Sequence, residues 1–473
     1  MSRVLRMIPA RPVMILAMTA LIGGCTTLNG PDGPFSPVKS LVAEKIQSDA
    51  IRVRTEAEAE AARRRTRQLL ARPLSPDAAV QIALLNNAGL QAAYTEIGLA
   101  EAHLIQESLP PNPRITLGRS VRGDEVMIER KLILDILGLA TLPLRHEIAA
   151  ERLSQTQLRA AAETLRIAVE TRRAYYRTIA AKQLLDYLGE ARSAAESASD
   201  LAKKLGETGA WNKLDQAREH AFYAEIGAQS ASAQQRYRSE REQLVRAMGL
   251  WGADLNFRLP SRLPNLPKAP KTLNAVESAA IKERIDIEIA RRELALLAKT
   301  LGLTQATRFV NVFEVGAWRT TETGQPVERG VEIELVVPLF DFGQARVLRA
   351  EETYLQALHR LREQAVNARS QARDAYQTYR TAFDVARHYR DEIVPLRKTI
   401  AEEGLLRYNA MVADTFRLLA DTRQTVASVS ASIEAQRDFW LSSVDLFATV
   451  AGAGAGARTN VVMAAPAAEP PSH

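Results

Sequence analysis

The side chains that most often do chemistry in proteins are few and scattered in this sequence of 473 residues. There is a single cysteine, so the chain can form neither an internal disulfide nor a thiolate metal cluster. Adjacent acids such as Glu402 and Glu403 point apart on a helix, and no nucleophile motif or glycine-rich phosphate loop occurs. The six histidines lack the spacing of metal ligands and are expected on helix surfaces: His103, His146, His220, His359, His388 and His473. We therefore expect no enzyme, and no bound metal or cofactor.

The position of the cysteine suggests a different chemistry. Residues 1–24 hold three arginines, then an apolar run, then two glycines directly before Cys25. A basic segment, an apolar segment and small residues in this order are typical of an export signal. The end of this segment resembles the lipobox of bacterial lipoproteins, in which the cysteine is acylated with fatty acids such as palmitate. We predict that Cys25 is the lipidated first residue of a mature outer membrane protein. A plain signal peptide with an incidental cysteine is the alternative.

The charge pattern argues against a polyanion as partner. The formal net charge of +7 falls to +4 once residues 1–24, with three arginines and no acid, are removed. Basic and acidic residues alternate along the expected helices, as in Arg360-Leu361-Arg362-Glu363. No block of like charge is long enough to hold a nucleic acid, and we expect no such partner.

The composition is that of a folded chain with few large core residues. Hydrophobic residues make up 46% of the chain, charged residues 25% and aromatic residues 5%. A chain of this composition is not intrinsically disordered over its whole length. The shortage of aromatic residues favours long helices that pack through small side chains. No stretch reaches the roughly 18 consecutive apolar residues of a membrane-spanning helix. We therefore do not expect a polytopic helical membrane protein.

Long helical hairpins are the main predicted element. Helical periodicity runs from about residue 142 to Gly206, and a second helix is expected from Asn212 to Met248. Gly206 and Gly209 lie between them and are predicted to be turn residues that permit a positive φ. Two helices of this length joined by a tight turn form a coiled-coil hairpin roughly 60 to 90 Å long.

Two pairs of strands are also predicted. Residues 115–121 and 125–134 alternate in polarity, as do 309–318 and 329–337. In the last run Glu332 and Glu334 alternate with aliphatic residues, so the sheet would have one apolar and one acidic face. A membrane barrel fits this pattern, with Glu332 and Glu334 facing a polar lumen. Because four strands cannot close a barrel, the protein would have to oligomerise. A small soluble sheet with one wet face fits the alternation equally well.

The order of elements occurs twice along the chain, which predicts six segments. They are a signal peptide (1–24), an acylated linker with a charged helical piece from about 38 to 70 (25–74), a first repeat (75–258), a proline-rich connector (259–271), a second repeat (272–450) and a disordered tail (451–473). The predicted fold class is mainly α with a small β part, built from two tandem repeats of long helical hairpins and strand pairs.

Five motifs mark these repeats. They are residues 76–87 at the start of the first repeat, 109–113 before the first strand, Gly209 with Leu214-Asp215 at the first turn, 337–343 after the last strand, and Arg407-Tyr408 with Leu418-Leu419 at the second turn. In this order, over about residues 75–447, the sequence resembles the TolC-type outer membrane efflux protein family.

The resemblance implies a homotrimer whose strands form one twelve-stranded barrel, continued into the periplasm by a helical tunnel. Such a protein is the exit duct of a tripartite efflux pump or type I secretion system, and it receives substrate from an inner-membrane transporter through a periplasmic adaptor. Tyr408 matches a tyrosine near the periplasmic aperture of the family, and Asp414 and Asp421 lie at or after the same turn, where a three-fold axis would form rings of charge. Solvated helix ends are the alternative for these residues. A periplasmic coiled-coil adaptor or structural lipoprotein is the alternative for the whole chain.

Overall fold

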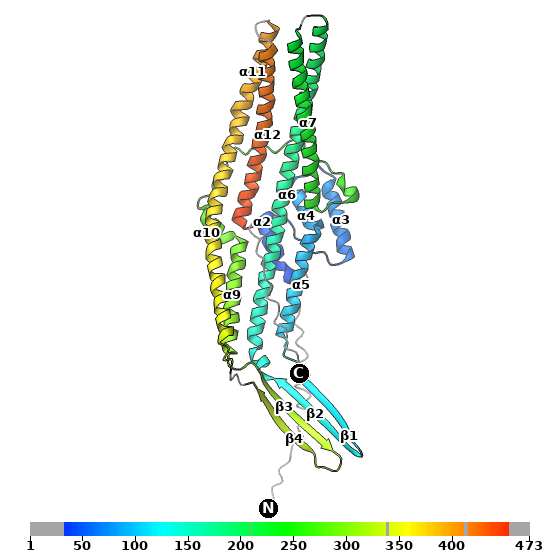
Figure 1. Ribbon diagram of the computed structural model, residues 1–473, viewed down its shortest axis with the longest axis vertical. Helices are drawn as coiled ribbons and strands as arrows, with labels where there is room; N and C mark the ends of the chain where they lie inside the picture. The colour runs from blue at the N-terminus through cyan, green and yellow to red at the C-terminus, as the bar shows by residue number, and fades with distance from the viewer. Residues whose placement is uncertain (1–32, 210, 337–339, 411–414, 454–473) are drawn as a thin grey trace, which may run out of the picture.

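The computed structural model describes residues 33–209, 211–336, 340–410 and 415–453. These residues form a long rod of helices with a four-stranded sheet at one end and the tips of two helical hairpins at the other (Figure 1). The first half contains η1 (Gly33–Phe35), α2 (Ser36–Ile46), α3 (Glu56–Leu70), α4 (Pro76–Asn86), α5 (Ala88–Ser108), β1 (Arg114–Arg122), β2 (Glu125–Asp135), α6 (Ile136–Glu207), α7 (Lys213–Met248) and η2 (Gly252–Leu255). The second half contains α8 (Val276–Glu283), α9 (Ile285–Ala306), β3 (Phe313–Glu322), β4 (Glu328–Leu335), α10 (Gln344–His388), the π-turn η3 (Tyr389–Ile393), α11 (Val394–Asn409) and α12 (Thr415–Ala451).

The longest helix, α6, runs from the sheet to the far end of the rod. Its 72 residues span about 110 Å at 1.5 Å per residue. Asp135 begins it, because its side chain accepts a hydrogen bond of 2.7 Å from the backbone N–H of Gly138. The helix starts six residues before the predicted residue 142 and tolerates Pro143, which removes one backbone hydrogen bond near the helix start.

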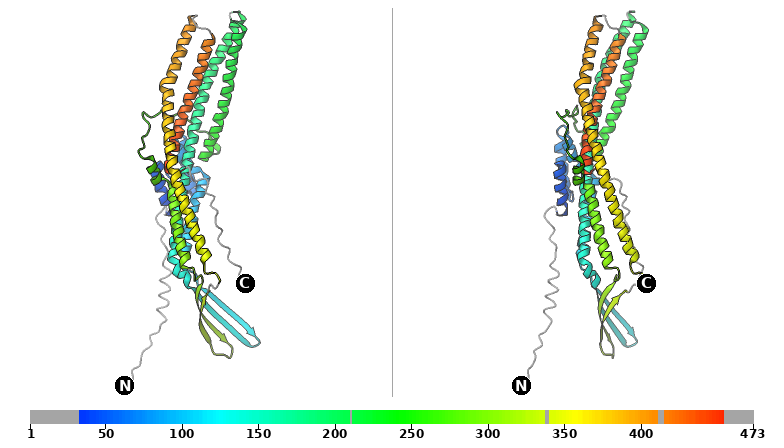
Figure 2. Two further views of the ribbon diagram at one scale, coloured as in Figure 1. Left: turned by 60° about the vertical axis from the view of Figure 1, so that its left-hand side comes forward. Right: turned by 90° about the vertical axis from the view of Figure 1, so that its left-hand side faces the viewer.

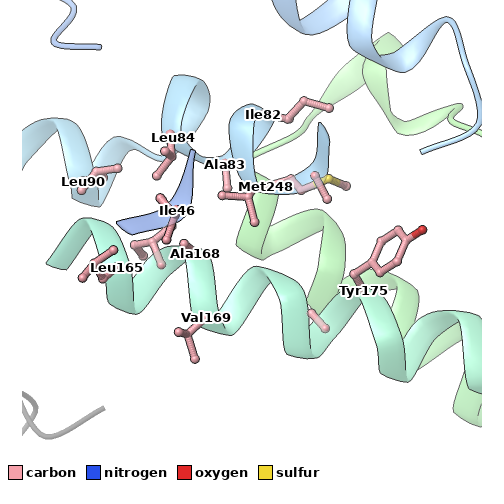
Figure 3. Packing of buried hydrophobic residues seen from close by; sticks show 14 of the residues in the cluster. Ile46, Ile82, Ala83, Leu84, Leu90, Leu165, Ala168, Val169, Tyr175 and Met248 are labelled. Carbon is pink, nitrogen blue, oxygen red and sulfur yellow. The ribbon is translucent and has the colours of Figure 1, made fainter. Parts of the chain in front are cut away.

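The main core lies midway along the rod, where α2, α4, α5 and α7 pack on α6. Small side chains such as Ala83 and Ala168 are fully buried there and let the helices approach closely (Figure 3). Two buried tyrosines satisfy their hydroxyl groups within it: Tyr94 Oη lies 2.9 Å from Thr164 Oγ1, and Tyr175 Oη donates to the carbonyl of Leu74 at 2.9 Å. The predicted packing of long helices through small residues is found in this core.

One helical prediction needs correction. The charged piece expected from 38 to 70 is two helices, because Gln47 takes a left-handed conformation and Thr55 begins α3 with a capping box to Glu58. In the second half, the π-turn η3 separates α10 from α11 just before Pro395, which cannot donate a backbone hydrogen bond.

The strands form one antiparallel sheet in the order β1-β2-β3-β4. The central pair, β2 and β3, joins the two halves of the chain (Figure 2). The predicted third strand, 309–318, is displaced by four residues, since β3 covers Phe313–Glu322. Pairing with β2 sets this register, and Thr323 fixes its end by accepting from the N–H of Val126 at 3.1 Å. β4 ends at Leu335, two residues before the predicted end, and residue 337 lies outside the described part of the chain.

Candidate functional site

The pairing of the strands sorts their side chains onto two faces, because directly paired residues project from the same side of a sheet. One side, the polar face, carries every acid of the four strands: Glu125, Glu129, Asp135, Glu314, Glu322, Glu328, Glu332 and Glu334. The other side, the apolar face, carries eleven aliphatic side chains: Ile115, Leu117, Val121, Val126, Ile128, Leu132, Leu134, Val315, Val331, Ile333 and Leu335.

No described part of the chain covers the apolar face. Leu117 and Val331 each keep 74% of their surface exposed, and Ile333 keeps 67%. A contiguous apolar patch of this kind marks a contact with protein or membrane. Both edge strands, β1 and β4, also lack a second neighbour within the described residues. The sheet is therefore incomplete in two ways, at its edges and on one face.

The polar face contains ordered charge pairs. Lys131 on β2 reaches across β3 to Glu332 on β4, and its Nζ lies 2.6 Å from Oε2 of Glu332. Glu334 is exposed and pairs in register with Glu314, which in turn pairs with Asp135. Three acids in one row repel one another, and Arg114, which bonds to Glu314, offsets part of that repulsion.

The sequence reasoning missed Asp135 and Glu314 as members of this acidic row. Both lie between apolar neighbours, as Glu332 and Glu334 do, so the alternation could have indicated them. Their juxtaposition with Glu334 depends on the register of three strands, which no local pattern contains.

The first hairpin tip lies between α6 and α7. Gly209 has a φ of +75° and donates its N–H to the carbonyl of Gly206 at 3.0 Å. Gly206 differs from the expectation of a positive φ, because it belongs to the last turn of α6. A Cβ at Gly206 would lie 1.9 Å from Nε2 of Gln216, so a larger residue here would displace the end of the Gln216 side chain.

The second hairpin tip lies beside the first at the end opposite the sheet (Figures 1 and 2). Tyr408 is in the last turn of α11 and is partly exposed. Asp421 lies on α12 and faces α11, since its Oδ2 is 3.5 Å from the position of a Cβ on Gly404. Asp414 and Cys25 lie outside the described residues.

Ion pairs and one buried acid connect the hairpins. Arg236 bonds to Glu434 at 3.1 Å, and Arg423 lies 3.5 Å from Glu225, each pair joining α7 to α12. Glu219 on α7 is 3% exposed, and its Oε2 has no hydrogen-bond partner among the residues that the structure describes. Burial raises the pKa of Glu219, while the charge of Arg423 lowers it less strongly.

The described residues contain no group of three or more His, Cys, Asp or Glu side chains that could hold a metal ion. Among the described helices, none combines the length and the apolar character needed to cross a membrane. The geometry that stands out is a two-faced sheet at one end of a helical rod and two hairpin tips at the other.

This arrangement is the fold of the TolC-type outer membrane channels. CusC, whose structures concern folding and transmembrane channel formation, matches with a TM-score of 0.68 and 15% identity over 80% of this chain and 92% of that chain. The outer-membrane channel OprN matches with a TM-score of 0.67 and 16% identity, over 87% and 95% of the two chains. The Campylobacter jejuni outer membrane channel CmeC matches with a TM-score of 0.65 and 14% identity, over 89% and 86%. No family model and no curated protein sequence matches the chain.

The predicted fold class is thereby confirmed. The structure is mainly helical, with long helices and a four-stranded antiparallel sheet, and its structural relatives across most of the chain are TolC-type outer membrane channels.

Proposed function

We propose that this chain forms the outer membrane duct of a tripartite efflux pump or a type I secretion system. The observation that carries the proposal is the sheet with an exposed apolar face, an acidic face and two unpaired edges. Backbone groups at an open sheet edge cannot be left unpaired in lipid. Pairing β4 of one copy with β1 of the next satisfies both edges, and three copies give a barrel of twelve strands.

In such a barrel the apolar face contacts lipid and the polar face lines the lumen. Glu332 and Glu334 then lie in the lumen of each copy, together with Glu314 and Asp135. Rings of acids in a pore favour the passage of cations. The rod continues the lumen into the periplasm as a helical tunnel.

The hairpin tips form the periplasmic end of the duct in this proposal. Tyr408, Asp414 and Asp421 surround the aperture there, and the turns at Gly206 and Gly209 meet a periplasmic adaptor. The adaptor in turn connects the duct to an inner-membrane transporter. Cys25 anchors the mature chain in the outer membrane by its acyl groups. Each copy is then attached to the membrane both by these acyl groups and by its four strands in the barrel.

Single-channel recording tests this function. Full-length protein extracted in detergent is expected to have the mass of a trimer and to insert stable, cation-selective pores in a planar bilayer. The double variant Glu332→Gln/Glu334→Gln is expected to lower the ratio of cation to anion permeability by on the order of twofold, because each trimer loses six lumenal charges.

The control is Glu56→Gln/Glu60→Gln, which removes the same charge from exposed positions on α3. Selectivity that is unchanged in the sheet variant, or equally changed in the control, would contradict the lumen assignment alone. A water-soluble monomer that inserts no pore would contradict the duct itself and favour a periplasmic coiled-coil adaptor.

A further inference from the structure

Four arginines interrupt the apolar face of the sheet. Arg130, Arg319 and Arg329 are paired directly across β2, β3 and β4. Arg119 on β1 pairs with Ile128, one step nearer the turn on the same face. All four side chains are exposed, and we call them the arginine patch.

No carboxylate is available to this patch from its own sheet face. Every acid of the strands projects from the polar face, and the described structure gives none of the four guanidinium groups a carboxylate partner. The polar face differs, since Arg114 is paired with Glu314 and Lys131 with Glu332. Like charges placed directly opposite each other on a sheet repel. The patch therefore lacks the negative charge that would neutralise it.

The patch lies toward the turns and away from the helices. Six residues separate Arg319 from Phe313 at the helical end of β3, which corresponds to about 20 Å along the strand. Aliphatic residues such as Leu132, Val331 and Ile333 fill the apolar face over this distance. Beyond Arg130, Arg319 and Arg329, the β1–β2 hairpin continues the aliphatic face with Val121, Val126 and Ile128.

A lipid-facing arginine costs about 2–4 kcal/mol at the middle of a membrane and about 0–1 kcal/mol near its surface. The row of arginines therefore sets the level at which the apolar face meets the headgroups. Guanidinium groups bind phosphate through two parallel hydrogen bonds, so phosphate is the anion that suits this row.

We propose that Arg119, Arg130, Arg319 and Arg329 bind the phosphate groups of lipid headgroups in the membrane leaflet that surrounds the turn end of the sheet. This inference rests on the proposed barrel, in which the apolar face contacts lipid. A trimer carries the patch three times around its circumference, and each copy holds headgroup phosphates at a fixed height on the barrel.

Lipid binding to the full-length, detergent-extracted protein tests the inference, with diphosphorylated lipid A as the probe and its dephosphorylated form as the comparison. The unchanged protein is expected to bind the phosphorylated form at least about tenfold more tightly, because hydrogen bonds between charged groups are the strong ones. The variant Arg319→Gln/Arg329→Gln is expected to lose about tenfold in affinity for the phosphorylated form, for the same reason. The control Arg114→Gln/Arg122→Gln removes equal charge from the polar face and is expected to change the affinity less than about twofold.

Equal binding of the two lipids to the unchanged protein would overturn the inference even if no variant folds. Equal losses in the patch variant and the control would also overturn it, since they would show only a response to net charge. In both cases, pores recorded from the same preparation keep the proposed duct intact. Absence of both pores and trimers would reject the duct, and the inference with it.

Discussion

Glu219 is a buried acid of α7 near Arg423 of α12, and its Oε2 has no hydrogen bond within the described part of the chain. Its neighbour Arg423 also contacts two other residues. The carboxylate of Glu225 lies 3.5 Å from the guanidinium group, and the centre of the Phe222 ring lies 5.3 Å from it. Because burial raises the pKa of Glu219, the folded protein binds this proton more tightly than the unfolded chain. The charged form therefore destabilises the contact between the hairpins at neutral pH.

We expect Glu219→Gln to stabilise the protein at pH 7 by about 1 kcal/mol, because a neutral amide then replaces a buried carboxylate that lacks a hydrogen bond. The gain should decrease as the pH falls through the raised pKa of Glu219, because the wild-type side chain then becomes neutral as well. Thermal unfolding of the variant and the wild type at several pH values between 7 and 4.5 measures this difference.

The matched change Glu225→Gln removes an exposed acid that contacts the same arginine, and should alter stability by less than about 0.5 kcal/mol. A gain from Glu219→Gln that does not depend on pH would show that the carboxyl group is not the cause.

The turn between α6 and α7 is the element on which the first hairpin depends. Gly209 adopts a φ of +75°. Its N–H donates to the carbonyl of Gly206 at 3.0 Å, and the N–H of Trp211 donates to the carbonyl of Leu205 at 3.2 Å. A glycine in this position ends a helix without the strain that a Cβ would add.

We expect Gly209→Ala to destabilise the hairpin by about 1 kcal/mol, because the left-handed conformation is costly for a residue with a Cβ. Gly227→Ala is the matched control, since Gly227 lies within α7 and a Cβ there would meet nothing within 4 Å. This control should stabilise the helix by about 0.5–1 kcal/mol. Hydrogen exchange of the backbone amides near the tip, compared between the two variants, distinguishes the effects; equal protection in both would contradict the role assigned to the turn.

The whole molecule is incomplete as a single chain, because its sheet has two unpaired edges among the described residues. Ser120 near the end of β1 and Glu328 at the start of β4 are both exposed on the polar face. If β1 of one copy pairs with β4 of the next, these positions approach each other between copies and not within one.

We expect the double variant Ser120→Cys/Glu328→Cys, treated with a flexible thiol crosslinker in membranes, to form covalent dimers and trimers and nothing larger, because three copies close the ring. Each single variant should remain monomeric on a denaturing gel. Dimers from a single variant, or a series that continues beyond the trimer, would contradict a closed ring built from these edges.

Much of the fold could be predicted from local pattern. The helical period from residue 142 to Gly206 and the alternation around Glu332 and Glu334 each depend on neighbours in the sequence, and the structure contains the corresponding helix and strand. Boundaries were less predictable where tertiary contacts decide them, as in the four-residue displacement of β3.

The sequence by itself determined the order of helices and strands and the two-sided character of the sheet, because side-chain periodicity follows directly from backbone geometry. Only the tertiary structure decided which residues of distant segments meet: Glu314 beside Glu334, Arg130 beside Arg319, and Glu219 buried among the hairpins. These contacts depend on strand register and on the packing of helices far apart in the chain. Alternation along one strand predicts which of its residues share a face, whereas strand register decides which residues of the neighbouring strand lie opposite them.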